Sequence, residues 1–133
     1  MELKRFGVSL EEDLLSALDE FVEERHFPNR SQALRYLIKN NIVRKKWEEN
    51  EVVAGAIVLV YDHHKRDLMH QLTDLQHDYH ELILSSQHFH LERSLCMEII
   101  AVKGMAKKLI ELSDKLIAVK GIHHGKLTMS RAD

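Results

Sequence analysis

The sequence predicts an α+β protein made of two dissimilar units, a small strand-helix-helix unit followed by a sheet with two helices on one face. Changes in the hydrophobic pattern support this prediction. The N-terminal segment passes from strict alternation to a helical period of apolar residues. From Val52 onward, apolar runs and amphipathic stretches follow the order strand-helix-strand-strand-helix-strand, which is the order of a ferredoxin-like fold.

The composition narrows the class of protein. With 44% apolar and 30% charged residues, the chain of 133 residues is ordinary for a soluble globular protein. No apolar run reaches membrane-spanning length, the N-terminus lacks a signal-peptide pattern, and a single cysteine excludes a disulfide framework. We therefore expect a cytoplasmic protein without a membrane partner. The net charge is only −2, so any nucleic-acid contact must come from local patches.

The N-terminal unit begins with an amphipathic strand. Apolar and polar side chains alternate over residues 5–10, which predicts that one face is buried. The apolar face consists of Phe6, Val8 and Leu10, and the opposite face consists of Arg5, Gly7 and Ser9. Nothing else in this unit can pair with the strand, so we expect it to pair with its copy from a second subunit.

Two helices follow this strand. Apolar residues at helical spacing begin at Leu14 and predict a helix to about Arg25, with acidic residues in its first turn. Pro28 interrupts the pattern, and Asn29 followed by Gln32 forms a capping-box pattern that predicts the start of a second helix. One strand and two helices are too small a unit to bury a good core alone, which again favours an intertwined dimer.

The C-terminal segment predicts a four-stranded sheet. The predicted strands cover residues 52–61, 86–91 and 95–102 and start again near residue 122, and the predicted helices cover residues 65–77 and 105–119. The charged stretch 44–51 is the expected connection between the N-terminal unit and this sheet. We therefore place the two domains at residues 1–48 and 49–133.

Four candidate metal ligands lie close together in the second domain: His77, His88, His90 and the only cysteine, Cys96. Residues i and i+2 of a strand share a face, so the two hairpin histidines project together, and a register that pairs His90 with Cys96 adds the thiol. Imidazoles with a thiolate suit Ni, Cu, Co or Zn rather than Mg or Ca. Glu98 shares the strand face of Cys96 and is predicted to support a ligating imidazole.

The metal site has a plain structural alternative. Most of the ten histidines, taken one at a time, are better interpreted as surface residues, and a lone buried cysteine usually acts as a small apolar residue. The combination of two histidines on one face with a thiol opposite them favours a metal site over this structural alternative. Spacing alone does not place His77 relative to the hairpin.

The N-terminal unit carries candidate DNA contacts. A two-stranded ribbon fits the major groove and reads base edges with its outward residues, which here are Arg5, Gly7 and Ser9. Arg5 suits a bidentate contact to guanine. Arg30 and Ser31 lie at the start of the second helix, where backbone N–H groups and the helix dipole favour a phosphate. The alternative is a dimerisation module with no role in DNA binding.

The alternating segment 5–10, the helix start at residues 29–31 and the hairpin ligands together resemble the nickel-responsive ribbon-helix-helix regulators, the NikR family. The resemblance covers essentially the whole chain and includes the stretch 61–68. It implies a ribbon-helix-helix DNA-binding domain over residues 1–48. It also implies a ferredoxin-like, ACT-type domain for metal binding and tetramerisation over residues 49–133.

The same resemblance implies a function. The protein would be a nickel-dependent repressor of nickel-uptake genes that binds a palindromic operator in double-stranded DNA. The implied assembly is a homotetramer, a dimer of dimers, with one Ni(II) per subunit in square-planar coordination. The ligands would be His88, His90 and Cys96 of one subunit and His77 of its neighbour.

Individual positions agree with the family's pattern or depart from it. Lys65 and Arg66 match family positions implicated in contact with the DNA backbone. Better-known members carry threonine at the position of Gly7, so the operator sequence does not carry over. Gln32 and Tyr36 replace an acidic pair that forms a low-affinity cation site in some members.

Two other functions compete with regulation. The chain could store or deliver nickel or copper, with an N-terminal module that only dimerises. A metalloenzyme is the weaker alternative, because all four ligand positions are filled by protein and none remains open for substrate. We therefore expect a regulator and not an enzyme.

Overall fold

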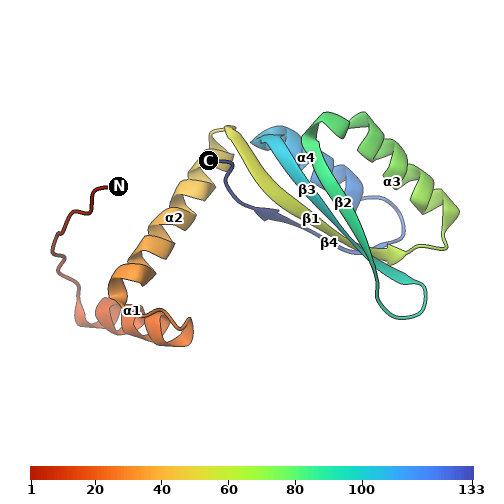
Figure 1. The fold of residues 1–133 in the computed structure, drawn as a ribbon. Coiled ribbons are helices and arrows are strands. Elements are labelled where there is room, and N and C mark those ends of the chain that lie inside the picture. The colour runs from red at the N-terminus through yellow and green to blue at the C-terminus, as the bar shows by residue number, and fades with distance from the viewer. The chain divides into compact units, whose positions relative to one another are not determined.

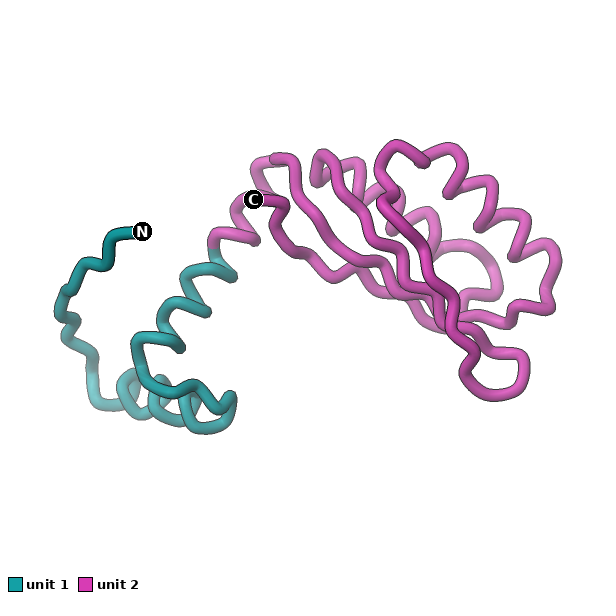
Figure 2. Tube along the Cα trace, viewed as in Figure 1, with its two compact units in different colours: residues 1–41 teal, residues 42–133 magenta.

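Two helices precede a four-stranded antiparallel sheet in the computed structural model, which describes residues 1–133 (Figure 1). The chain divides into two compact units, residues 1–41 and 42–133 (Figure 2). The elements are α1 (Glu12–Glu24), α2 (Arg30–Glu48), β1 (Val52–Asp62), α3 (Arg66–Asp78), a short 3-10 helix η1 (His80–Leu82), β2 (Ile83–His90), β3 (Leu95–Met105), α4 (Ala106–Ile117) and β4 (Ile122–Met129). The predicted α+β class and the predicted order of elements in the C-terminal segment are confirmed. None of the helices combines the length and apolar character needed to cross a membrane.

The first unit contains α1 and most of α2. Glu12 and Asp13 lie in the first turn of α1, where negative charge is favoured by the helix dipole. The backbone N–H of Gln32 donates to the Oδ1 atom of Asn29 at 2.9 Å, so the predicted cap at the start of α2 is confirmed. The aromatic rings of Phe21, Phe27 and Tyr36 pack together between the two helices, with centroids 5.4–6.1 Å apart.

The strand expected within residues 5–10 does not form in the single chain. These residues lie outside helices and strands, and their apolar side chains are exposed. A strand is stabilised by hydrogen bonds to a neighbouring strand, and a single chain offers none here. The pairing of this strand with a second copy therefore stays a prediction.

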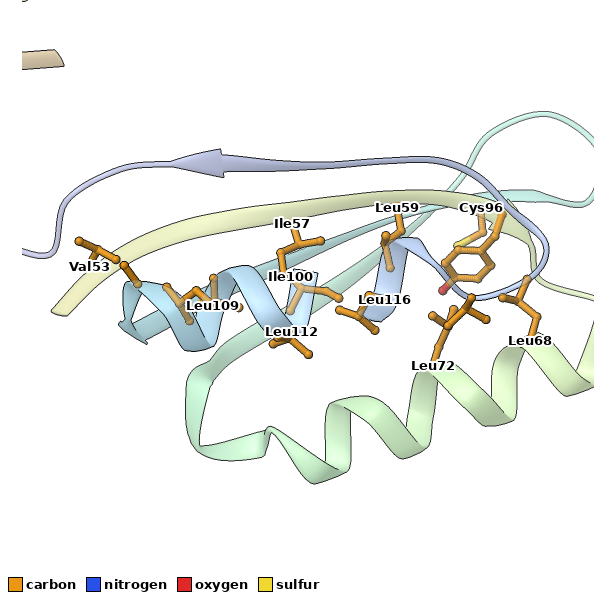
Figure 3. Packing of buried hydrophobic residues seen from close by; sticks show 14 of the residues in the cluster. Val53, Ile57, Leu59, Leu68, Leu72, Cys96, Ile100, Leu109, Leu112 and Leu116 are labelled. Atoms are coloured by element: carbon orange, nitrogen blue, oxygen red, sulfur yellow. The ribbon is translucent and has the colours of Figure 1, made fainter. Parts of the chain in front are cut away.

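The second unit is a sheet with strand order β2-β3-β1-β4. β1 is central and pairs with β3 on one side and β4 on the other. Helices α3 and α4 lie on the same side of the sheet, and the buried side chains of the strands point toward them (Figure 3). The predicted placement of two helices on one face is confirmed.

Alternation along the strands separates a closed face from an open face. The closed face buries Val53, Ile57, Leu59 and Tyr61 of β1 and Cys96, Glu98, Ile100 and Val102 of β3. The neighbouring positions of the same strands point away from the helices and are only partly buried; among them are Val58, Val60, Met97 and Ile99. One face of the sheet therefore contributes to the core, and the other leaves apolar side chains within reach of solvent.

The C-terminal segment holds the end of α2 against the sheet. Trp47 is buried, and its Nε1 donates to the backbone carbonyl of Ser130 at 2.8 Å. The N–H of Ser130 donates in turn to the carbonyl of Ala54 on β1 at 2.8 Å. Lys46 Nζ lies 3.1 Å from Asp133 Oδ2. These contacts lie within the second unit, so the last turns of α2 belong to it.

Candidate metal centre

The hairpin of β2 and β3 carries three of the four predicted ligands. Its register pairs His90 with Cys96 and His88 with Glu98, so the predicted hairpin register is confirmed. Directly paired residues of antiparallel strands project from the same face, and these four side chains therefore share the face that α3 and α4 cover. Arg93 in the connecting turn adopts a φ of 56°, the left-handed conformation that reverses the chain.

The thiol and one imidazole lie within reach of a common ion. Cys96 Sγ is 3.8 Å from His88 Nδ1. Typical metal–sulfur and metal–nitrogen bonds are about 2.3 and about 2.0 Å, and their sum exceeds this separation, so one metal ion can bridge the two atoms. Cys96 is buried, whereas the His88 side chain is 52% exposed. The thiol therefore forms the floor of the candidate site and the imidazole forms its rim.

A buried carboxylate lies behind this pair. Glu98 is 1% exposed and accepts a hydrogen bond from the Tyr61 hydroxyl on Oε1 at 2.7 Å. Its Oε2 accepts from the Gln76 amide at 3.1 Å and from the Ser86 hydroxyl. The same Oε2 lies 3.4 Å from His88 Nε2. The carboxylate is thus satisfied by three neutral donors and remains next to the imidazole.

Tyr61 stays a hydrogen-bond donor in this network. Burial, reinforced by the hydrogen bond to Glu98, raises the pKa of its hydroxyl far above the ordinary value. The hydroxyl therefore keeps its proton and continues to donate to the carboxylate. It also lies 3.4 Å from His88 Nδ1.

The other two predicted ligands do not reach the thiol within one chain. The ring of His90 packs edge-on against His63, with ring centroids 4.8 Å apart. His77, near the end of α3, stacks on His80 at 6.0 Å. No group of three or more His, Cys, Asp or Glu side chains in the chain is arranged to hold a metal ion. A single chain therefore supplies a pair of neighbouring donors, not a complete coordination shell.

Three residues that donate hydrogen bonds to Glu98 were not predicted as site residues: Tyr61, Gln76 and Ser86. Ser86 lies two residues before His88 on the same strand, so alternation alone could have placed it on this face. Tyr61 reaches the site because β1 pairs with β3, opposite Cys96. That long-range pairing leaves no local signal in the sequence.

The candidate DNA contacts of the first unit are exposed: Arg5, Gly7, Ser9, Arg30 and Ser31. In the single chain the guanidinium of Arg30 forms a bidentate ion pair with Asp19, at 2.8 and 2.9 Å. The hydrogen bond from Arg30 holds the pKa of the Asp19 carboxyl below its ordinary value. The guanidinium is therefore already engaged in the absence of DNA.

Two further candidate contacts lie in the second unit, at the start of α3. Lys65 is the N-cap of this helix and Arg66 is its first residue, and both are exposed. They line one depression together with Lys120. Positive side chains beside the N-terminus of a helix suit an anion such as a phosphate.

Two family models match the chain. One, described as the NikR C terminal nickel binding domain, matches residues 54–130. The other, described as a ribbon-helix-helix protein of the copG family, matches residues 4–45. The chain belongs to the NikR family. The predicted resemblance is confirmed, together with a ribbon-helix-helix unit before a NikR regulatory domain. NikR proteins are transcription regulators and not enzymes, as expected from the sequence.

NikR relatives align with nearly the whole chain. A protein from Syntrophus aciditrophicus is 47% identical over 129 residues, which cover 97% of this chain and 94% of the relative. A protein from Chlorobium phaeobacteroides is 48% identical over 132 residues, which cover 99% and 98% of the two chains. A protein from Desulfotalea psychrophila is 47% identical over 128 residues, covering 96% and 94%. The names given to all three assign them as nickel-responsive regulators.

One solved structure shows a likeness of fold. An uncharacterized protein from Thermotoga maritima aligns with 59% of this chain and 98% of its own length, with a TM-score of 0.54 and 20% identity. At this identity the likeness concerns the fold alone.

Proposed function

We propose that this NikR protein is a nickel-dependent repressor of nickel-uptake genes, located in the cytoplasm, that binds a palindromic operator through a two-stranded β-ribbon. The observation that carries the metal part is the pair formed by Cys96 and His88, 3.8 Å apart and backed by the carboxylate of Glu98. The match to the nickel-binding domain over residues 54–130 and the names of the relatives support nickel as the metal.

The proposed site binds one Ni(II) per subunit. His88, His90 and Cys96 of one subunit supply three ligands, and His77 of a neighbouring subunit supplies the fourth. Imidazoles and a thiolate are the donors that suit this metal, and a planar arrangement of four favours Ni(II) or Cu(II). His77 and His90 are exposed in the single chain, which leaves both available to a second copy.

The surroundings of His88 indicate which of its two ring nitrogens would bind the metal. Its Nδ1 faces the thiol, and its Nε2 faces Glu98. A carboxylate that accepts from the remote nitrogen of an imidazole fixes the tautomer and orients the ring. In the proposal Glu98 thus keeps the proton on Nε2 and leaves Nδ1 free to bind. When bound, the metal supplies a coordinate link between two subunits.

A homotetramer, built as a dimer of dimers, gives the exposed apolar surfaces a partner. In the first unit, Phe6 and Val8 are 79% and 62% exposed. In the second unit, the open face of the sheet carries partly buried apolar residues such as Val60 and Ile99, outside the core cluster. Two separate self-associating surfaces are what a dimer of dimers requires.

Residues of both units contribute to the proposed DNA interface. The outward residues of the ribbon read base edges in the major groove, and the other contacts bind phosphates. The base-reading residues are Arg5, Gly7 and Ser9, and the phosphate contacts are Arg30, Ser31, Lys65 and Arg66. Because nickel joins subunits, it favours one arrangement of the tetramer and so changes DNA affinity. By linkage, DNA must then tighten nickel binding by the same factor.

An operator can be selected from random duplex DNA with the nickel-loaded protein and then titrated with and without stoichiometric nickel by fluorescence anisotropy. The proposal expects nickel to tighten operator binding by about 5–150-fold, the usual size of a coupling between two sites. Equal affinity in both conditions would exclude nickel-dependent regulation. Operator-independent DNA binding combined with rapid transfer of nickel to an acceptor would instead support storage or delivery.

A further inference from the structure

Helix α3 is tied to the sheet very unevenly along its length. Leu68 and Leu72, in its first half, are 2% exposed and belong to the core cluster. In its second half, Leu75 is only partly buried, and His77 is exposed. One side-chain hydrogen bond joins this half to the sheet, from the Gln76 amide to Glu98 Oε2 at 3.1 Å. The C-cap of the helix, Tyr79, is held separately to α4 by a hydrogen bond to Glu111 at 2.9 Å, so the Gln76 contact is the side-chain hydrogen bond that fixes this half of α3 to the sheet.

The acceptor of this bond is shared with the metal pair. Glu98 Oε2 receives Gln76 from the helix and lies 3.4 Å from Nε2 of His88 on β2. Glu98 itself lies two residues from Cys96 on β3, and both side chains are buried on one face. A single buried carboxylate thus touches a candidate ligand of the hairpin and the residue immediately before His77.

We propose that Gln76 is a positioning residue of the nickel centre, which fastens the end of α3 to Glu98 and thereby orients His77. The inference rests on the proposed metal site. In that site His77 serves the neighbouring subunit, whereas Cys96 and His88 serve their own. The Gln76–Glu98 hydrogen bond consequently lies between two nickel sites of the tetramer and couples the geometry of one to the other.

The test replaces Gln76 by methionine, which keeps the length of the side chain and removes its N–H donors. Gln71→Met is the matched control, because Gln71 is an exposed glutamine of the same helix with no hydrogen bond to Glu98. In the metal-free full-length protein, Q76M should speed amide hydrogen exchange over residues 73–78 by about fivefold, the effect of losing one hydrogen bond. Exchange in β3 and in the Q71M control should not change. Unchanged exchange over residues 73–78 in Q76M would overturn the proposal.

Nickel titrations of the same tetramers provide the second readout. Loss of a residue that orients a ligand typically weakens metal binding about 10–100-fold, and we expect Q76M to fall in this range while Q71M binds as the unchanged protein does. In a His77→Ala background, Q76M should cause little further loss, since its effect passes through His77. Full additivity of the two substitutions would overturn the proposal. If the unchanged protein shows no thiolate-to-nickel charge-transfer band, the proposed function itself fails, whereas a normal band with unchanged affinity in Q76M removes only the role of Gln76.

Discussion

The two units of the chain bury their apolar residues to different extents. Residues 42–133 enclose a continuous core between the sheet and two helices, with many side chains at 0% exposure. In residues 1–41 Ala33 is the one buried apolar residue, and Leu3, Phe6 and Val8 are exposed. The second unit therefore completes its hydrophobic core within one chain, whereas the first leaves most of its apolar residues uncovered in a single chain. The proposed metal centre is an exception to this contrast, because one chain completes the core of the second unit but brings together only two of the four proposed ligands.

The largest expected effect concerns this exception. Cys96→Ala should abolish the thiolate-to-nickel charge-transfer band, because it removes the sulfur at the floor of the site. His77→Ala should keep the band, bind nickel more weakly and lose the nickel-dependent gain in operator affinity. Absorbance and anisotropy titrations of both variants would check this. A band that persists in Cys96→Ala would mean that the thiol is only a core residue.

The core of the second unit gives the next largest effect. Leu112 on α4 is 0% exposed, and Leu112→Ala should lower the free energy of unfolding by about 2–5 kcal/mol, through lost burial and a residual cavity. Urea unfolding at two protein concentrations would measure it. Because the core lies within one chain, we expect the same loss at both concentrations. A loss that varies with concentration would show that this core also depends on assembly.

In the first unit, unlike the second, the effect of a substitution should depend on protein concentration. Phe6 is 79% exposed in the single chain, and covering such a side chain in a dimer contributes roughly 1.5–3 kcal/mol. Phe6→Ser should therefore weaken self-association, with an effect that grows as the protein is diluted. Analytical ultracentrifugation would follow the loss of the dimer. Lys4→Ser serves as the control, because it changes an exposed polar neighbour without removing an apolar side chain.

The smallest effect concerns pH and the end of the chain. The hydrogen bond from Lys46 holds the pKa of Asp133 below its ordinary value of 3.8. A depressed folded-state pKa stabilises the fold above pH 3.8, and this contribution is lost as the pH falls through the folded pKa. Asp133→Asn should thus slightly lower stability at neutral pH and make no difference in strong acid. Thermal melts at several pH values would show it, and an equal loss at all pH values would contradict it.

Local patterns were sufficient to predict most elements of the second unit. The near-continuous apolar run of β1 and the helical periods of α3 and α4 predicted these elements. The short turn between β2 and β3 restricts the register that pairs His90 with Cys96. The ribbon of the first unit was predicted only with a second copy, and the single chain leaves its residues without a partner. Its pairing depends on an assembly that no single chain contains.

The candidate site was less predictable than the fold. Spacing was enough to predict that Cys96, Glu98 and the two hairpin histidines share one face, because they alternate along adjacent strands. Tyr61 and Gln76 were missed, since one reaches Glu98 through the pairing of β1 with β3 and the other through the packing of α3 on the sheet. Contacts between residues distant in sequence follow from the assembled fold and not from a local period.

The hydrogen bond between Trp47 and Ser130 also bears on the mechanics of the protein. Helix α2 is continuous from Arg30 to Glu48, and its end is attached to the sheet twice, through the chain into β1 and through this bond to the segment that follows β4. The last turns of α2 are therefore held at two neighbouring strands of the sheet, the central β1 and the edge strand β4, and not by one linker alone.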